Sequence, residues 1–473
     1  MLKLFLIRDK MIITPEFMII FMLVTLFIFL LSGYPVAFTI SGVPLVFAII
    51  GHFFNVFDLS YVAALPNRIY GIMTNDLLIS VPLFVFMGVM LQKSKIAEEL
   101  LESMSILMQN VRSGLTISVT IVGALLAAST GIVGATVVTM GLLSMPTMLK
   151  KGYSPSLASG TICAAGTLGQ IIPPSIVLIL LSDQISASYQ QAQLALGNFS
   201  PEAVSVTDLF LGALLPGIAL VILYIFWQIL NSYINPSSIP DKIILKKKED
   251  AFTIYKQVLK ALLPPLLLII AVLGSILAGL ATPTESAGVG AIGAIFLSFI
   301  KKQLSIKVVK EVVESTAKTT SMVFIILVGA ALFSLVFRGY GGDEIVAHFL
   351  TNITGGILIS IIITMLAIFI LGFFLEVFEI IYVVVPIIGP AILMMGVDPL
   401  WFAIMIAVNL QTSFLTPPFG FALFYLRGVA PKSVKTLEIY KGAMPFVCIQ
   451  IIMLIILWQF PKLATYLPKV IYG

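Results

Sequence analysis

Two segments of the chain, 244 residues apart, each place a pair of prolines inside a long apolar run. They read Gly-Gln-Ile-Ile-Pro-Pro-Ser at residues 169–175 and Ser-Phe-Leu-Thr-Pro-Pro-Phe at residues 413–419. Proline lacks a backbone N–H and clashes with the preceding turn, so each pair predicts a broken helix. In an apolar surrounding, the freed backbone groups need protein, water or a solute as partners. Two matched breaks therefore indicate a solute site within a membrane.

Composition supports a membrane location for these breaks. Of 473 residues, 59% are hydrophobic and 10% are charged, whereas soluble chains carry about 25% charged residues. Long apolar runs without the alternation of barrel strands predict an all-α polytopic membrane protein. The net charge of +5 comes from lysines beside these runs, which indicates contact with the lipid bilayer and no nucleic-acid partner. Cys163, Cys448, His52 and His348 are isolated, which predicts no disulfide, no transition metal and no cofactor.

The chain also contains an internal repeat with a constant offset. Five positions recur 244 residues later: Pro146, Gly152, Pro155, Pro173 and Pro174 return as Pro390, Gly396, Pro399, Pro417 and Pro418. We therefore predict a first repeat at residues 11–231, a charged linker at 232–260 and a second repeat at 261–462. Each repeat is expected to contain a helical hairpin, at about 114–149 and about 357–395, and a discontinuous helix, at about 156–181 and about 400–426.

The hairpins are predicted to be re-entrant. Their first example has helices of about 15 residues, or about 22 Å, which is short of a hydrocarbon core of about 30 Å. Each repeat then crosses the membrane an odd number of times, so the two repeats have inverted topology. Residues 183–208 have no counterpart of similar length in the second repeat, and we expect a polar loop there.

Basic residues predict the orientation. With the linker at 232–260 in the cytoplasm, 20 of the 27 Lys and Arg residues fall on the cytoplasmic side, as the positive-inside rule favours. Both termini are then periplasmic, and the chain is a multi-pass protein of the bacterial inner membrane. The other seven basic residues are Lys3, Arg8, Lys10, Arg68, Arg338, Lys462 and Lys469.

The hairpin tips and the breaks offer oxygen ligands for a cation such as Na⁺. The candidate ion-binding residues are Ser129, Thr130, Gly131, Gly134, Gly169, Gln170, Gly372, Glu376, Thr412, Ser413 and Thr416. Freed N–H groups at half-helix N-termini suit an anion, so the candidate substrate-binding residues are Pro173, Pro174, Ser175, Pro417 and Pro418. Small residues also serve ordinary helix packing in membranes, and this alternative stays open for each of them.

Three acidic residues near apolar segments have different expected roles. Glu376 is the sharpest ion-site candidate, because acids inside a membrane are costly and usually functional. Glu379 is expected to reach the membrane rim. Glu285, in the stretch Thr-Pro-Thr-Glu at 282–285, is expected to mark a helix start.

Several stretches resemble the large membrane subunit of tripartite ATP-independent periplasmic (TRAP) transporters, the DctM-like subunit. The resemblance covers nearly the whole chain and is strongest at residues 129–139, 151–153, 169–175, 281–285, 372–376 and 415–420. It implies an elevator mechanism, driven by a Na⁺ gradient, for organic acids delivered by a periplasmic substrate-binding protein. It also implies a small four-helix membrane subunit, expected on a separate chain because the first span begins near residue 12.

The sequence thus favours a Na⁺-coupled, binding-protein-dependent permease for a carboxylate-type solute, and not an enzyme. A secondary dicarboxylate or anion transporter that needs no binding protein is the nearest alternative. A membrane subunit of an energy-converting enzyme complex would need a row of Lys, Glu and His inside the membrane, and these are scarce. A purely structural membrane protein would not need paired breaks. No residue pattern excludes H⁺ as the coupling ion.

Overall fold

The computed structural model describes residues 14–108, 110–240 and 251–472, apart from the side chains of Ala97, Ser129, Thr130, Gln257 and residues 251–255. Within these ranges every regular element is a helix, and nine helices are long and apolar enough to cross a membrane. The prediction of an all-α polytopic membrane protein is confirmed.

The helices follow one another in two halves. The first half holds α1 (Pro15–Leu31), α2 (Val36–Phe53), α3 (Ser60–Ala63), α4 (Leu65–Met73), α5 (Asp76–Lys93), α6 (Ile96–Leu107), α7 (Gly114–Thr130), α8 (Val133–Lys150), α9 (Pro155–Thr167), η2 (Leu168–Gln170), α10 (Ile176–Ala195), α11 (Val206–Ile234) and η3 (Pro236–Ser238). The second half holds α12 (Ala251–Leu277), α13 (Pro283–Ile300), α14 (Ile306–Gly339), α15 (Gly342–Thr351), α16 (Gly356–Leu371), α17 (Val377–Glu379), the π-helical turn η4 (Ile380–Val384), α18 (Val385–Met394), α19 (Pro399–Leu415), α20 (Phe421–Val429), α21 (Thr436–Gln459) and α22 (Lys462–Tyr472).

Positions 244 residues apart adopt the same local structure. Ser154 and Asp398 each cap a helix that starts with proline, and each side chain accepts the backbone N–H of the third helical residue. Gly152 and Gly396 have φ angles of 90° and 86°, a region that side chains rarely tolerate. The turn that leads into each broken helix is therefore built in the same way in both halves.

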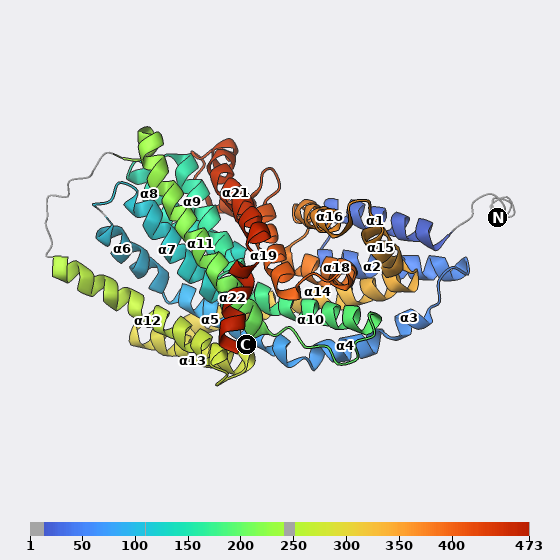
Figure 1. Cartoon of the computed structure of the whole chain (residues 1–473). Helices are drawn as coiled ribbons and strands as arrows, with labels where there is room; N and C mark the ends of the chain where they lie inside the picture. Colours follow the sequence, from blue (N-terminus) through green and yellow to red (C-terminus); the bar gives the residue numbers. More distant parts are fainter. Residues whose placement is uncertain (1–13, 109, 241–250, 473) are drawn as a thin grey trace.

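The two halves interlock. Helix α2 packs on α14 of the second half, and α13 packs on α5 of the first half. In Figure 1, α1, α2, α14, α16 and α18 form one end of the elongated molecule, while α6–α8, α12 and α13 lie toward the other. The broken helices join the two ends, since α9 contacts α7 and α8 whereas α10 contacts α18. Helices of each half thus pack against helices of the other half.

Two predicted features differ from the structure. The helix after the first break does not end near residue 181 but continues to Ala195, so the predicted polar loop at 183–208 is helical in its first half. Its polar residues recur with helical spacing and line a recess: Asp183, Gln184, Ser188 and Gln191. The first hairpin is also longer than expected, with 17 residues in α7 and 18 in α8.

The remaining boundaries concern the linker and the helix starts. Helix α11 runs to Ile234 and α12 begins at Ala251, while residues 241–250 of the predicted linker lie outside the described residues, as does the basic N-terminus. The predicted helix start at 282–285 is confirmed. Thr282 caps α13 by accepting the backbone N–H of Glu285, and the Glu285 carboxylate accepts the N–H of Thr282 in return.

Candidate functional site

Two helices are interrupted by the proline pairs in the middle of the molecule. At the first break α9 passes into the short turn η2, and α10 begins only at Ile176. Ser175 bridges this gap, because its hydroxyl donates to the carbonyl oxygen of Gln170 at 3.2 Å. At the second break α19 ends at Leu415 and α20 begins at Phe421. Both Pro–Pro peptide bonds are cis.

The tip of the first hairpin lies against the first break. Gly131 ends α7 with a φ of 62°, and a Cβ on it would lie 3.0 Å from the backbone nitrogen of Ile176. On the other side of the break, a Cβ on Gly169 would lie 2.7 Å from the carbonyl oxygen of Ala127. Glycine is therefore required at both positions for the hairpin and the break to approach so closely.

The second hairpin makes the matching contact. A Cβ on Gly372, at the end of α16, would lie 2.2 Å from Oγ of Ser413 in the second break. In the first half, Gly131 of the hairpin and Gly169 of the break both allow the close approach, whereas in the second half the glycine is Gly372 of the hairpin and the break carries Ser413. The close approach of tip and break is thus repeated in both halves.

Tyr425 of α20 links the two tips. Its hydroxyl donates to Oε1 of Glu376 in the second tip at 2.8 Å. A Cβ on Gly134 in the first hairpin would lie 3.0 Å from the same tyrosine ring.

The prediction that Glu379 reaches the membrane rim is wrong. Glu379 is 2% exposed, and its carboxylate accepts the backbone N–H of Glu376 at 2.9 Å, which fixes the start of α17.

The two broken helices meet at their equivalent positions. Nε2 of Gln411 donates to Oγ1 of Thr167 at 3.3 Å, and these two residues are 244 positions apart. The contact therefore joins the same position of the two repeats. Next to it, Gln170 is fully buried, and neither atom of its amide has a partner among the described residues.

Hydroxyl groups of the second break are arranged as acceptors. Thr412, Ser413 and Thr416 each donate their proton to a carbonyl oxygen one turn back in the chain. Their oxygen lone pairs remain available, which is the form in which a hydroxyl can coordinate a cation. Oxygen donors are also the ligands that suit Na⁺ at broken helices.

The other candidate residues fall into distinct environments. Pro173, Pro174 and Ser175 are buried, whereas Pro417 is half-buried and Pro418 is exposed. Ser129 and Thr130 close α7, but their side chains lie outside the described part of the structure. Among the described residues, no group of three or more His, Cys, Asp or Glu could hold a metal ion.

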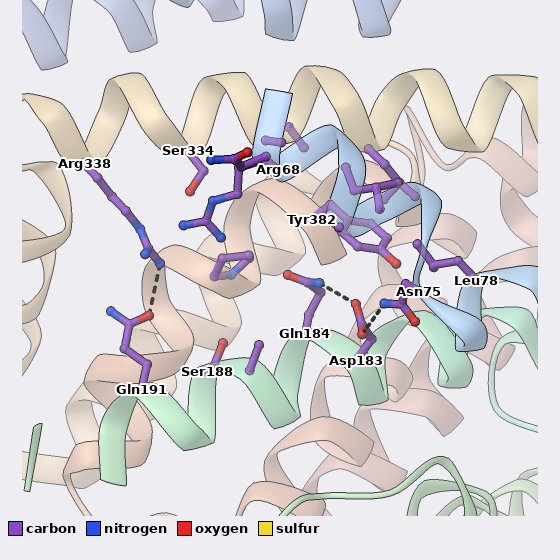
Figure 2. Close-up of a pocket in the computed structure, with 18 residues that line it drawn as sticks. Arg68, Asn75, Leu78, Asp183, Gln184, Ser188, Gln191, Ser334, Arg338 and Tyr382 are labelled. Atoms are coloured by element: carbon purple, nitrogen blue, oxygen red, sulfur yellow. Dashed lines mark hydrogen bonds between the residues drawn. The ribbon is translucent and has the colours of Figure 1, made fainter. Parts of the chain in front are cut away.

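A polar recess of about 500 Å³ lies beside this centre, between α4, α10, α14 and η4 (Figure 2). At one end, the guanidinium of Arg338 donates to Oε1 of Gln191 at 3.0 Å. At the other end, the Asp183 carboxylate accepts from Nδ2 of Asn75 at 3.0 Å and from Nε2 of Gln184 at 2.8 Å. Arg68 of α4 and Ser334 of α14 also line the recess: Arg68 is exposed and Ser334 is half-buried.

A second recess, of about 840 Å³, lies further toward the start of α14. Its lining includes Lys318 and Ser321 of α14 together with Phe374, Glu376 and Glu379 of the second tip. The second hairpin contacts α14 through α17 and η4 and thus separates the two recesses.

Several of these residues were missed by sequence reasoning. The 244-residue offset, applied to Thr167, would have identified Gln411. No local signal marks Tyr425, because it lies within an ordinary apolar helix. Arg68 and Arg338 were counted only as basic residues of the non-cytoplasmic side, and no sequence pattern brings them to one recess.

With this geometry established, comparison with known proteins defines the family. The model of the DctM component of tripartite ATP-independent periplasmic transporters matches residues 23–463. The chain belongs to this family. The C4-dicarboxylate TRAP transporter large permease protein DctM of Vibrio cholerae is 28% identical over 425 residues, which cover 84% of this chain and 86% of that protein.

Other relatives of this TRAP large permease are named for different solutes. The sialic acid TRAP transporter large permease protein SiaM of Vibrio cholerae is 25% identical, with 94% of this chain and 97% of that protein covered. The ectoine TRAP transporter large permease protein TeaC of Halomonas elongata is 26% identical, with 94% and 98% covered. The TRAP permease described here is therefore a multi-pass membrane transport protein and not an enzyme.

A solved structure shares the fold. The crystal structure of the YdaH transporter of Alcanivorax borkumensis matches with a TM-score of 0.60 at 15% identity, covering 86% of this chain and 90% of that one. At this identity the match concerns the fold alone.

Proposed function

We propose that this TRAP large permease takes up an organic acid across the bacterial inner membrane, coupled to Na⁺ and supplied by a periplasmic substrate-binding protein. The observation that carries the proposal is the meeting of two buried breaks at Thr167 and Gln411, each flanked by a hairpin tip. Freed backbone groups, the Gln170 amide and the hydroxyls of the second break would supply the oxygen ligands, since η2, which holds Gln170, contacts α19, which holds Thr412 and Ser413. The substrate-binding role of the proline pairs belongs to the same proposal.

We further propose an elevator mechanism, in which the hairpins and broken helices move against the remaining helices. Its support is the pair of recesses along α14, one on each flank of the second hairpin. Tyr382 and Pro386 of the hairpin line one recess, and Glu376 and Glu379 line the other. A hairpin that moves along α14 would narrow one recess as it widens the other, as alternating access requires.

The orientation in the membrane and the lipid- or subunit-facing surface that we propose follow from the distribution of basic residues and of exposed apolar residues. The repeats at 11–231 and 261–462 have inverted topology, the linker at 232–260 is cytoplasmic, and both termini are periplasmic. Helix α1 exposes an apolar face that supports contact with lipid or with a small four-helix subunit on a separate chain: Phe17, Ile20, Phe21, Val24 and Ile28.

Uptake into proteoliposomes tests the proposal. The chain would be purified with its small subunit and supplied with binding proteins loaded with radiolabelled organic acids, under an inward Na⁺ or H⁺ gradient. Uptake that needs both Na⁺ and binding protein is the expected result. Uptake of free solute without binding protein would instead make the chain a transporter that works alone, and uptake driven only by H⁺ would contradict Na⁺ coupling.

A matched pair of variants locates the ion site within this assay. Thr412→Val should raise the Na⁺ concentration for half-maximal uptake, because it removes one oxygen ligand from the second break. Thr364→Val makes the same change at another buried threonine, on α16, and should leave Na⁺ dependence unchanged. Equal effects of the two changes would contradict an ion site at the second break.

A further inference from the structure

The recess in Figure 2 is lined by two arginines that form no ion pair with the described carboxylates. Arg68 and Arg338 lie close enough for their charges to repel each other, and within the described ranges neither forms an ion pair. Asp343 lies near Arg338 but makes no ion pair with it. Asp183 lies at the opposite end, where two side-chain amides bind its carboxylate. Two guanidinium groups without a carboxylate partner indicate a site for an anion that is not part of the chain.

The hydrogen bond to Gln191 shows that Arg338 binds an oxygen acceptor within the recess. The amide oxygen of Gln191 accepts from Nη2 of Arg338 at 3.0 Å, where a carboxylate oxygen would form a stronger, charge-assisted bond. An arginine carries five N–H donors in a planar fork that matches a carboxylate. The other donors of Arg338 and all those of Arg68 have no acceptor among the described side chains.

Tyr382 gives an independent sign of a ligand. Its side chain is 9% exposed and lines the recess, yet its hydroxyl has no partner within the described part of the chain. Buried hydroxyl groups are normally hydrogen-bonded. Tyr382 belongs to the second hairpin, and Figure 2 shows its hydroxyl at the end of the recess where Asp183 and Asn75 lie. A ligand that extends from the two arginines toward Asp183 would also supply a partner for this hydroxyl.

We propose that this recess binds the carboxylate of a small hydroxylated or amino acid-like solute, with Arg68 and Arg338 as its ligands and the donor groups of the solute toward Asp183. A recess of about 500 Å³ has the size of a small-molecule site. The negative charge of Asp183 disfavours a second carboxylate at the far end. The proposal rests on the proposed function, because only in that orientation does the recess face the periplasm and receive solute before it reaches the breaks.

Thiol labelling of the full chain tests the site directly. Ser334 lies in the recess near Arg68 (Figure 2), so Ser334→Cys places a reporter there. The background carries Cys448→Ser, since Cys448 is exposed while Cys163 is fully buried. The rates with an anionic and a cationic methanethiosulfonate reagent are compared, each relative to free cysteine. We expect the anionic reagent to be favoured about tenfold or more, and Arg68→Gln with Arg338→Gln to abolish this preference.

Protection by solutes then identifies the ligand class. Gluconate should slow labelling, whereas sorbitol, which lacks the carboxylate, should not, and succinate should protect less than gluconate. Arg338→Gln should weaken the apparent affinity for gluconate at least about tenfold. Arg68→Gln, at an exposed residue without a described hydrogen bond, should act in the same direction with little risk of misfolding. Lys462→Gln removes one charge outside the recess and should change neither the preference nor the protection.

Three results would overturn the proposal. Equal labelling by the two reagents would show that the recess does not attract anions. Protection by gluconate that survives the loss of both arginines would place the anion elsewhere. Protection by succinate that equals that by gluconate would contradict the assigned orientation of the solute. Labelling needs no ion gradient and no binding protein, so a failure of Na⁺-coupled uptake would leave these results readable and would refute only the proposed function.

Discussion

The contact between the second hairpin and the second break can be tested with a single methyl group. In Gly372→Ala, the new Cβ would lie 2.2 Å from Oγ and 2.8 Å from Cβ of Ser413, where ordinary contacts begin near 3.4 Å. Ser413 is fully buried, so the hairpin tip or the break must shift by about 1 Å. Overpacking of this kind costs about 1–3 kcal/mol of the free energy of unfolding. The backbone adds no strain, because φ at Gly372 is −66°.

The assay is thermal unfolding of the full chain in detergent, together with a rescue. Ser413→Gly removes the atoms that clash and should restore most of the stability lost in Gly372→Ala. Gly274→Ala, in α12, is the control: nothing lies within 4 Å of the new Cβ, so stability should rise by about 0.5–1 kcal/mol. If Gly372→Ala melts like the unmodified chain, or if Ser413→Gly gives no rescue, the tip does not contact the break.

Three smaller changes probe other parts of the fold. Tyr425→Phe removes the hydrogen-bond donor to Glu376 and should lower the free energy of unfolding by about 1–2 kcal/mol. Tyr440→Phe, the control, removes an exposed hydrogen bond to a neutral carbonyl oxygen and should lower it by less than half as much. Equal melting temperatures of the two variants would contradict this expectation. Gln170→Leu should leave the melting temperature unchanged or raise it, because it removes a buried amide that has no partner among the described residues. The same variant should raise the Na⁺ concentration for half-maximal uptake. A large loss of stability would show that the amide is hydrogen-bonded. Thr282→Ala should cost about 0.5–2 kcal/mol in thermal unfolding by removing the cap of α13, and no change would mean that the cap does not form.

The backbone of this fold could be predicted because proline and glycine act locally. Pro173 and Pro417 lie at breaks, and Gly152 and Gly396 mark the turns before the broken helices. A proline pair alone does not decide this, because Pro264 and Pro265 lie inside the continuous helix α12. The two breaks were predicted because their proline pairs recur with the glycines at one offset between the halves. Helix ends were predicted less well, because the position of a helix end depends on which groups surround its polar residues in the folded protein.

The residues of the recess show why the site was harder to predict. Asp183 and Gln191 suggested a loop, because a polar stretch after an apolar helix usually leaves the membrane. In the structure they lie on one face of α10 and meet Arg338, which is 147 positions away from Gln191. Such a pairing depends on how the two halves interlock, and no local pattern contains that information.

The repeat is symmetric in its backbone but not in its side chains, and this difference bears on the proposed ion site. The second tip carries Glu376 and Glu379, whereas the positions 244 residues earlier are Ile132 and Ala135. Where the two broken helices meet, Thr167 faces Gln411, so equivalent positions hold a hydroxyl and an amide. Two symmetric breaks with different ligands cannot form two equal sites. At the proposed ion site, an acidic side chain can therefore come only from the second tip, because the corresponding positions of the first tip are apolar.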